Sequence, residues 1–203
     1  MKFNQFLLAA ALAVASIGAA QATATVPVTI YDLVSSPVKG SPGSFKAIFD
    51  NTAGYTTGML DFTLIGYNTL DGSTLPKWTD TFTLSLNDTV LGTGHLRLGG
   101  GGTTDWTWTN PATGTMTCPA CAQPQASHGG IATFSDVVLS GLWVGTNTIK
   151  FQYSGKKEGL QNESWQIKDA VVTAVPEPET YAMLLAGLCL MGAIARRRQD
   201  RQT

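Results

Sequence analysis

Apolar and polar residues alternate with a period of two along most of the chain. Phe82, Leu84 and Leu86 fall on one face of an extended segment, and the hydroxyl residues between them fall on the other. That pattern predicts a half-buried β-strand. The same alternation predicts further strands at Val28–Val34, Phe45–Phe49, Met59–Tyr67, Val90–Leu98, Trp106–Thr109, Ile131–Leu139, Thr148–Tyr153 and Trp165–Thr173.

Turn-forming residues separate these segments. They cluster at Ser41–Gly43, Asn68–Gly72, Asn87-Asp88, Gly99–Gly102 and Gly155–Gly159, where Gly, Pro, Asn and Asp favour tight turns. Short strands without a helical pattern predict an all-β fold, an antiparallel β-sandwich of jelly-roll type. We assign this fold to one domain over residues 25–174, because a stretch of about 150 residues can bury a core without a partner.

The N-terminus has the layout of a secretory signal peptide. Lys2 supplies a positive charge ahead of the apolar run Phe6–Ala15, and two overlapping Ala-x-Ala triplets follow between Ala20 and Ala24. This order is typical of an export signal that is cleaved after small residues. We therefore predict that residues 1–24 are a signal peptide and that the mature chain begins at Thr23 or Thr25.

The C-terminus has three parts in a fixed order. A proline-stiffened spacer at 175–180 contains Pro176, Glu177 and Pro178, an apolar stretch follows at 181–195, and basic residues end the chain at 196–203. The apolar stretch predicts one transmembrane helix of about 22 Å, which is short against a hydrocarbon core of roughly 30 Å. The adjacent arginines predict a cytoplasmic end and are Arg196, Arg197 and Arg198.

These three parts resemble the PEP-CTERM sorting signal of Gram-negative bacteria, over about Val175–Gln199. The resemblance implies that Val175, Pro176, Glu177 and Pro178 form a motif recognised by an exosortase, a membrane protease that removes the tail. It also implies transient anchoring in the inner membrane with the domain in the periplasm, then delivery to the cell surface or matrix, in association with exopolysaccharide or biofilm. An ordinary C-terminal membrane anchor is the alternative.

The net charge of the domain argues against one class of partner, and a second resemblance suggests another. Eight basic and eleven acidic side chains give residues 25–174 a net charge of −3, so nucleic acid is not an expected partner. The segments Leu142–Phe151 and Trp165–Val172 resemble the closing strands of carbohydrate-binding jelly rolls. That resemblance implies a sugar-binding ancestry and makes a carbohydrate-binding module the alternative function.

Two residue pairs are candidates for chemistry or binding. Cys118 and Cys121 are expected to form a disulfide outside the cytoplasm; the alternatives are a redox pair or a zinc site that includes His128. Trp106 and Trp108 are two apart and share one face of their strand. On an outer face they would form a platform for stacking on sugars, whereas on an inner face they would belong to the core.

The sequence nominates no catalytic constellation, cofactor or metal site. His95 and His128 do not lie in a recognisable nucleophile or metal-binding pattern, and the scattered Asp residues, Asp71 and Asp80 among them, suit turns and outer faces. A carboxylate pair for glycoside hydrolysis depends on the fold, and the sequence does not point to one. We therefore expect a protein that is not an enzyme, with a polysaccharide-acting hydrolase as the least favoured alternative.

Overall fold

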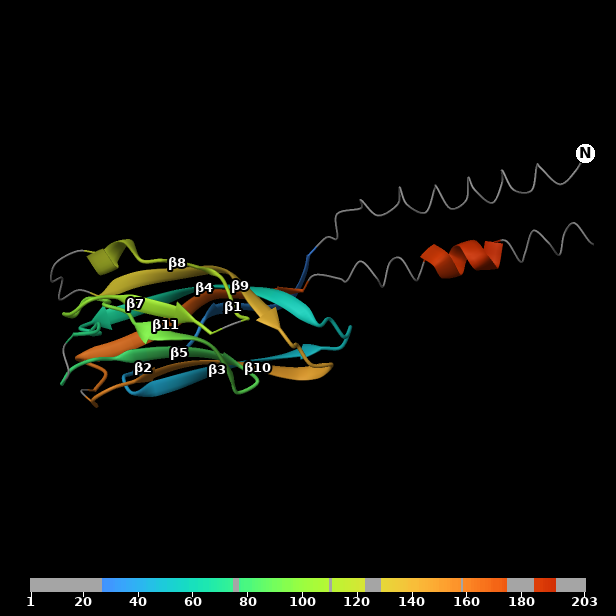
Figure 1. The fold of residues 1–203 in the computed structure, drawn as a ribbon. Coiled ribbons are helices and arrows are strands. Elements are labelled where there is room, and N and C mark those ends of the chain that lie inside the picture. The colour runs from blue at the N-terminus through green and yellow to red at the C-terminus, as the bar shows by residue number, and fades with distance from the viewer. Residues whose placement is uncertain are drawn as a thin grey trace, which may run out of the picture. The chain divides into compact units, whose positions relative to one another are not determined.

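The structure is a computed structural model that describes residues 27–74, 77–109, 111–122, 129–157, 159–174 and 185–192. It divides the chain into the compact unit Val28–Val175 and a second unit that contains both chain ends. Figure 1 shows the first unit as two layers of strands.

Two antiparallel sheets form the unit (Figure 1). The first has the order β1, β11, β4, β9, β8, with β2 also paired to β11. The second has the order β3, β10, β5, β6, β7. In the first sheet the strands are β1 (Val28–Ser35), β2 (Lys39–Gly40), β4 (Thr57–Asn68), β8 (Thr115–Thr117), β9 (Gly130–Ser140) and β11 (Glu163–Ala174). In the second they are β3 (Gly43–Asn51), β5 (Thr81–Leu86), β6 (Thr89–His95), β7 (Asp105–Trp108) and β10 (Gly145–Ser154).

The chain crosses repeatedly between the two sheets. It passes from β2 to β3, from β3 to β4, from β4 to β5, from β7 to β8, from β9 to β10 and from β10 to β11, and each of these steps changes sheet. Neighbouring strands are therefore often distant in sequence, as in sandwiches of jelly-roll type. The predicted all-β antiparallel sandwich is confirmed.

Phenylalanine side chains from both sheets meet in the core. The ring of Phe62 stacks on Phe134 at 4.5 Å between centroids and meets the edge of Phe151 at 5.0 Å. These residues occupy the inward positions of β4, β9 and β10, where buried and partly exposed positions alternate. The period of two in the sequence thus places one row of apolar side chains from each strand between the sheets.

Two turns have the backbone that their residues favour, and the first of them is the predicted turn at Asn87-Asp88. Asn87 and Asp88 have φ values of 47° and 66°, so both central residues of the β5–β6 hairpin are left-handed, as a two-residue hairpin of type I′ requires. Gly145 has a φ of 91° at the start of β10, a conformation that costs glycine little.

The structure differs from the predicted strands in three places. The short strands β2 and β8 have no counterpart in the prediction, because two or three residues are too few to show a period. The predicted strand Val90–Leu98 ends at His95. Leu98 forms isolated bridging contacts with Leu70 instead. The alternation of apolar and polar residues therefore continues beyond the end of β6 into a loop.

Candidate functional site

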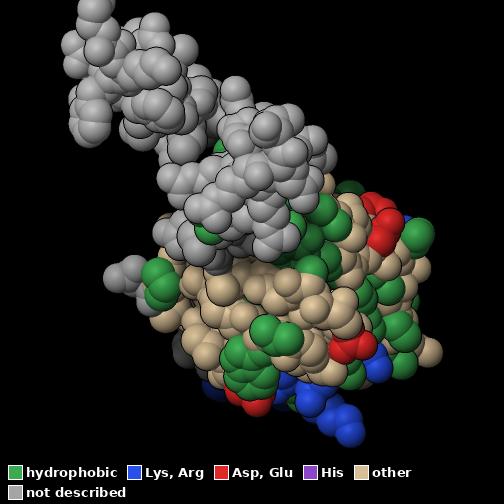
Figure 2. All heavy atoms as spheres, turned by 90° about the vertical axis from the view of Figure 1, so that its right-hand side faces the viewer, with side chains coloured by type: hydrophobic (Ala, Val, Ile, Leu, Met, Phe, Trp, Pro, Cys, Tyr) green, Lys and Arg blue, Asp and Glu red, His purple; other side chains and the backbone are tan. Residues whose placement is uncertain are grey.

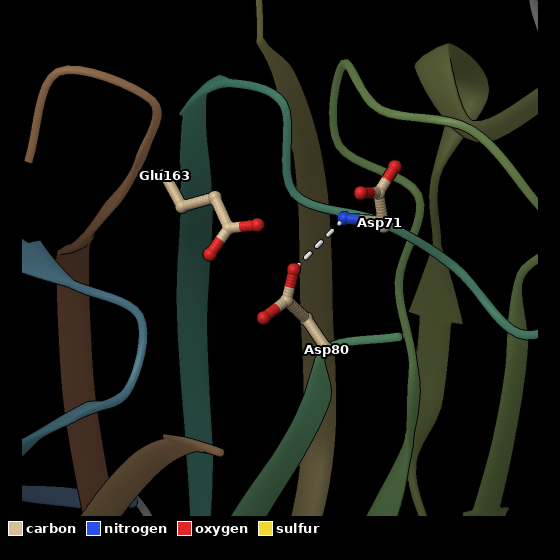
Figure 3. A group of neighbouring side chains, drawn as sticks. All are labelled: Asp71, Asp80 and Glu163. Carbon is tan, nitrogen blue, oxygen red and sulfur yellow. Dashed lines mark hydrogen bonds between the residues drawn. The ribbon is translucent and has the colours of Figure 1, made fainter. Parts of the chain in front are cut away.

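Three carboxylates converge at one end of the sandwich. Asp71, Asp80 and Glu163 each offer a carboxylate oxygen, and these oxygens all lie within 4.8 Å of one another. Figure 3 shows the side chains of Asp80 and Glu163 pointing toward each other, with Asp71 beside Asp80. Asp80 is 0% exposed, Glu163 is 1% exposed and Asp71 is partly exposed. We call this group the acidic cluster.

The acidic cluster joins the two sheets. Glu163 is the first residue of β11 in the first sheet, and Asp71 lies in the loop that connects β4 to β5. Asp80 immediately precedes β5 in the second sheet. Asp71 and Glu163 are 92 positions apart in the sequence, and only the packing of the sandwich brings them together.

Uncharged donors orient two of these carboxylates. The hydroxyl of Ser41 donates a hydrogen bond of 2.6 Å to Oδ1 of Asp80, and the amide of Asp71 donates one of 3.1 Å to Oδ2. The amide of Gly101 donates one of 2.5 Å to Oδ1 of Asp71. These bonds fix the positions of the two carboxylates.

The backbone packs directly against the acidic cluster. A Cβ atom at Gly155 would overlap Oδ1 of Asp80, and one at Gly100 would overlap Oδ1 of Asp71. Tyr153, two residues before Gly155, is completely buried. Burial raises the pKa of its hydroxyl well above the usual range, and the charge of Asp80 raises this pKa further.

The burial of the acidic cluster bears on the chemistry that it can support. Carboxylate oxygens close together suit general acid–base chemistry or the binding of a hard cation. A polysaccharide strand would need access to both carboxylates, but Asp80 and Glu163 are sealed from solvent. The geometry therefore favours a small ligand held inside the sandwich over a glycosidic bond.

Trp106 and Trp108 turn toward the core. Both indoles are partly buried and pack on the inner side of β7, where Trp106 meets the edge of Phe134 at 5.0 Å and Trp108 meets it at 6.2 Å. The two rings lie edge to face at 5.3 Å from each other. The sequence left open whether these rings belong to the core or form an exposed platform for sugars. The structure shows that they pack against the core.

Cys118 and Cys121 are joined by a disulfide, with 5.3 Å between their Cα atoms. Cys121 belongs to the 3-10 helix η2 (Pro119–Ala122). Its carbonyl accepts a hydrogen bond from Nη2 of Arg97, and Nη1 of Arg97 donates to the carbonyl of Gly102 at 3.3 Å. The disulfide and Arg97 line a shallow hollow of about 360 Å³ together with Gly102, Thr103, Thr104 and Met116.

The histidines do not join the acidic cluster in the described structure. Nδ1 of His95 lies 2.8 Å from Oδ1 of Asp105, in an exposed pair across β6 and β7. Partial burial alone raises the pKa of Asp105, but hydrogen bonds from Ser73 and His95 and the nearby imidazole outweigh it and lower that pKa. His128 lies outside the described residues.

The predicted targeting residues also fall outside the described residues. These are the signal peptide at 1–24, the sorting motif Val175, Pro176, Glu177 and Pro178, and the arginines Arg196, Arg197 and Arg198. Of the predicted transmembrane stretch at 181–195, residues 185–192 are described, and they are helical. Among the described helices, none combines the length and the apolar character needed to cross a membrane.

Sequence reasoning missed the acidic cluster. Asp71 and Asp80 were assigned to turns and outer faces, Glu163 was not singled out, and no metal ligands were assigned. A local signal was nevertheless present, because Glu163 begins a strand whose inward positions are otherwise apolar. A carboxylate at such a position needs a partner inside the fold.

The comparison with protein-family models identifies the C-terminal segment. Residues 174–199 match the PEP-CTERM protein-sorting motif, which confirms the resemblance of the Pro-Glu-Pro segment to this signal. The motif indicates an exported chain that is anchored in a membrane before cleavage and is processed by an exosortase. No curated protein matches the sequence.

Solved structures give only weak likenesses. Latent dimeric PorU from Porphyromonas gingivalis is 11% identical with a TM-score of 0.36, and the match covers 76% of this chain and 13% of PorU. The mosquito-larvicidal Cry4Aa toxin from Bacillus thuringiensis is 9% identical with a TM-score of 0.32, over 74% of this chain and 23% of the toxin. AvmM, which catalyses macrocyclization in alchivemycin A biosynthesis, is 16% identical with a TM-score of 0.20. The match covers 75% of this chain and 65% of AvmM. This chain thus spans only a small part of PorU and of the toxin, and the likenesses give no information about activity.

Proposed function

We propose that this chain is a non-catalytic protein of the cell envelope or extracellular matrix, in which the β-sandwich is the cargo and the PEP-CTERM tail directs its delivery. One observation carries the proposal. The last strand, β11, ends at Ala174, and the matched sorting motif begins at residue 174. Cleavage near Pro176-Glu177-Pro178 would therefore release a sandwich that keeps all its strands.

The position of β11 supports this proposal. The strand lies inside its sheet between β1 and β4, and Ala174 is fully buried and pairs with Val28 and Gly58. The fold is thus complete to the residue before the tail. A cut after residue 174 would not remove any of its ladder hydrogen bonds.

The burial of the acidic cluster supports a non-catalytic role. Asp80 and Glu163 are the best-placed groups for acid–base chemistry in the described structure, and neither reaches the surface. A hydrolase of large polysaccharides requires a cleft in which two carboxylates face the substrate. The acidic cluster is a buried junction between two sheets instead.

We further propose that the delivered domain associates with exopolysaccharide through the exposed indole of Trp143. Trp143 is 59% exposed, and indole faces of this kind stack on sugar rings. On the face shown in Figure 2, charged side chains stand in small separate groups among hydrophobic and uncharged polar ones. Such a surface suits a sugar polymer better than a strongly charged ligand.

A matched pair of variants tests the sorting proposal. Glu177→Ala changes the motif, and Glu179→Ala removes the same side chain two positions later. In the producing bacterium, Glu177→Ala should leave the uncleaved chain in the membrane fraction, and Glu179→Ala should be released like the wild type. Normal release of Glu177→Ala, and of a chain that ends at residue 174, would contradict the proposal.

A further inference from the structure

We propose that Asp71, Asp80 and Glu163 bind one calcium ion that holds the two sheets together at this end of the sandwich. The carboxylate oxygens lie within 4.8 Å of one another. Calcium binds oxygen ligands at about 2.3–2.6 Å, so oxygens on opposite sides of one ion are separated by up to about 5 Å. The cluster therefore needs little rearrangement to surround a calcium ion.

A bound cation or bound protons would relieve the repulsion among the carboxylates of the acidic cluster. Asp80 and Glu163 are buried, and neighbouring carboxylates in a low-dielectric site repel one another. The hydrogen bonds to Asp80 and Asp71 from Ser41 and Gly101 come from uncharged groups. A divalent ion would offset most of the charge of three ionised carboxylates.

Tyr153 provides an independent indication of a ligand. Its hydroxyl is completely buried and has no hydrogen-bond partner among the residues that the structure describes. The ring packs against Phe82 at 5.1 Å and Trp165 at 5.6 Å. These two residues follow Asp80 and Glu163 by two positions on β5 and β11, and so share the inward face with them.

The side chain of Tyr153 lies next to the acidic cluster. Tyr153 pairs with Phe82, which comes two residues after Asp80. At Gly155 the chain lies directly against the Asp80 carboxylate. A buried hydroxyl without a partner is rare in folded proteins. A water molecule bound to the calcium ion would give this hydroxyl a partner.

The arrangement predicts a structural role for the ion. Glu163 begins β11 in the first sheet, and Asp80 immediately precedes β5 in the second. Asp71 lies in the loop between β4 and β5, so an ion held by all three links the layers where the loops leave the core. Because the chain is exported, even a weak site would be filled by extracellular calcium, for which modules have Kd values of about 10⁻⁴–10⁻³ M.

Calcium binding to the purified full chain, kept in mild detergent and stripped of divalent ions with a chelator, tests this proposal. Isothermal titration with CaCl₂ should show one ion per chain. At a concentration of about 100 times the Kd, calcium should raise the Tm by about 5–10 °C. The same concentration of MgCl₂ should give a clearly smaller shift, because magnesium requires shorter and more regular ligand distances.

Variants separate binding from folding. Glu163→Gln and Asp71→Asn should each weaken calcium binding at least about tenfold, since each removes a charged ligand. Asp71→Asn keeps an oxygen for the Gly101 amide, so it tests the site even if Glu163→Gln fails to fold. Asp88→Asn, at the opposite end of β5, is the control and should bind like the wild type.

The signs of the Tm changes add a further check. In chelator, Glu163→Gln should unfold at the same temperature as the wild type or higher, because one repelling charge is gone; in calcium it should lose the stabilisation. Absence of calcium binding by the wild type, binding unaffected by both substitutions, or an equal response to magnesium would each overturn the proposal.

Discussion

Val28, the first residue of β1, pairs with Ala174, the last residue of β11. The first and last strands of the sandwich are thus neighbours, and the described strands all lie between these two residues. The last strand of the domain ends at the residue where the match to the sorting motif begins. This pairing links the fold to the proposed delivery, since the sandwich is finished before the tail starts.

Trimming the chain to residues 25–174 should leave its stability unchanged. The core residues and the paired strands lie within this range, so the free energy of unfolding should change by less than about 0.5 kcal/mol. Urea unfolding of the trimmed and full chains measures this. A chain that ends at residue 170 serves as a comparison. It lacks part of β11, which lies between β1 and β4, and it should fail to fold. A trimmed domain that unfolds much more easily than the full chain would contradict the proposed boundary.

Asn147→Ala should destabilise the domain by about 2–4 kcal/mol, because it leaves several buried polar groups without partners. Oδ1 of Asn147 accepts hydrogen bonds from the Trp143 amide and the Asn87 side chain, and Nδ2 donates to the carbonyls of Trp143 and Gly145. Chemical unfolding measures the loss. Thr146→Ala, which removes an exposed hydroxyl from the next residue, should have little effect; equal losses in the two variants would count against this role.

The tryptophans should separate into two classes. Trp143→Ala should reduce retention on the producing organism's polysaccharide without changing Tm, because its ring is 59% exposed. Trp106→Ala should instead cost about 2–4 kcal/mol of stability, since its ring packs on Phe82 and Phe134. Affinity co-sedimentation and thermal unfolding measure the two effects. Retention that depends on Trp106 alone would contradict the proposed binding surface.

The pair of His95 and Asp105 should give a small pH dependence. The pKa of Asp105 is lowered, so its contribution to stability is present above the unfolded pKa of about 3.9 and is lost as the pH falls through the lowered value. Because Asp105 is about half exposed, the contribution should stay below about 0.5 kcal/mol. Unfolding of the wild type and Asp105→Asn between pH 6 and pH 2 should therefore converge at the acid end. A gap that widens toward low pH would show the opposite sign.

The strands could be predicted from the sequence because each long strand has a buried face. Alternation in β5, β9 and β10 reflects one side chain pointing inward and the next outward. Short β2 and β8 are set by pairing with β11 and β9, and such pairing has no local signature. The buried side chain of Asn147 holds the turn at the start of β10 together through hydrogen bonds, and the pattern of the sequence does not show this role.

The acidic cluster could not be predicted because it is a property of the packed sheets. Asp71 and Asp80 look like turn residues in isolation, and Glu163 comes 83 positions after Asp80. Their meeting depends on β11 lying beside β4 and on β5 facing them from the other sheet. The orientation of Trp106 and Trp108 was undetermined for the same reason, since a period of two shows that they share a face and not which face it is.

The intact mass of the protein recovered from the cell surface or the growth medium tests the central claim most directly. We expect a chain that begins at Thr23 or Thr25 and ends close to Pro176-Glu177-Pro178, with the apolar segment and the arginines absent. In a strain without the exosortase, the chain should keep its C-terminus and stay with the membrane. A surface or medium form that extends to Thr203 in the wild-type strain would contradict the account.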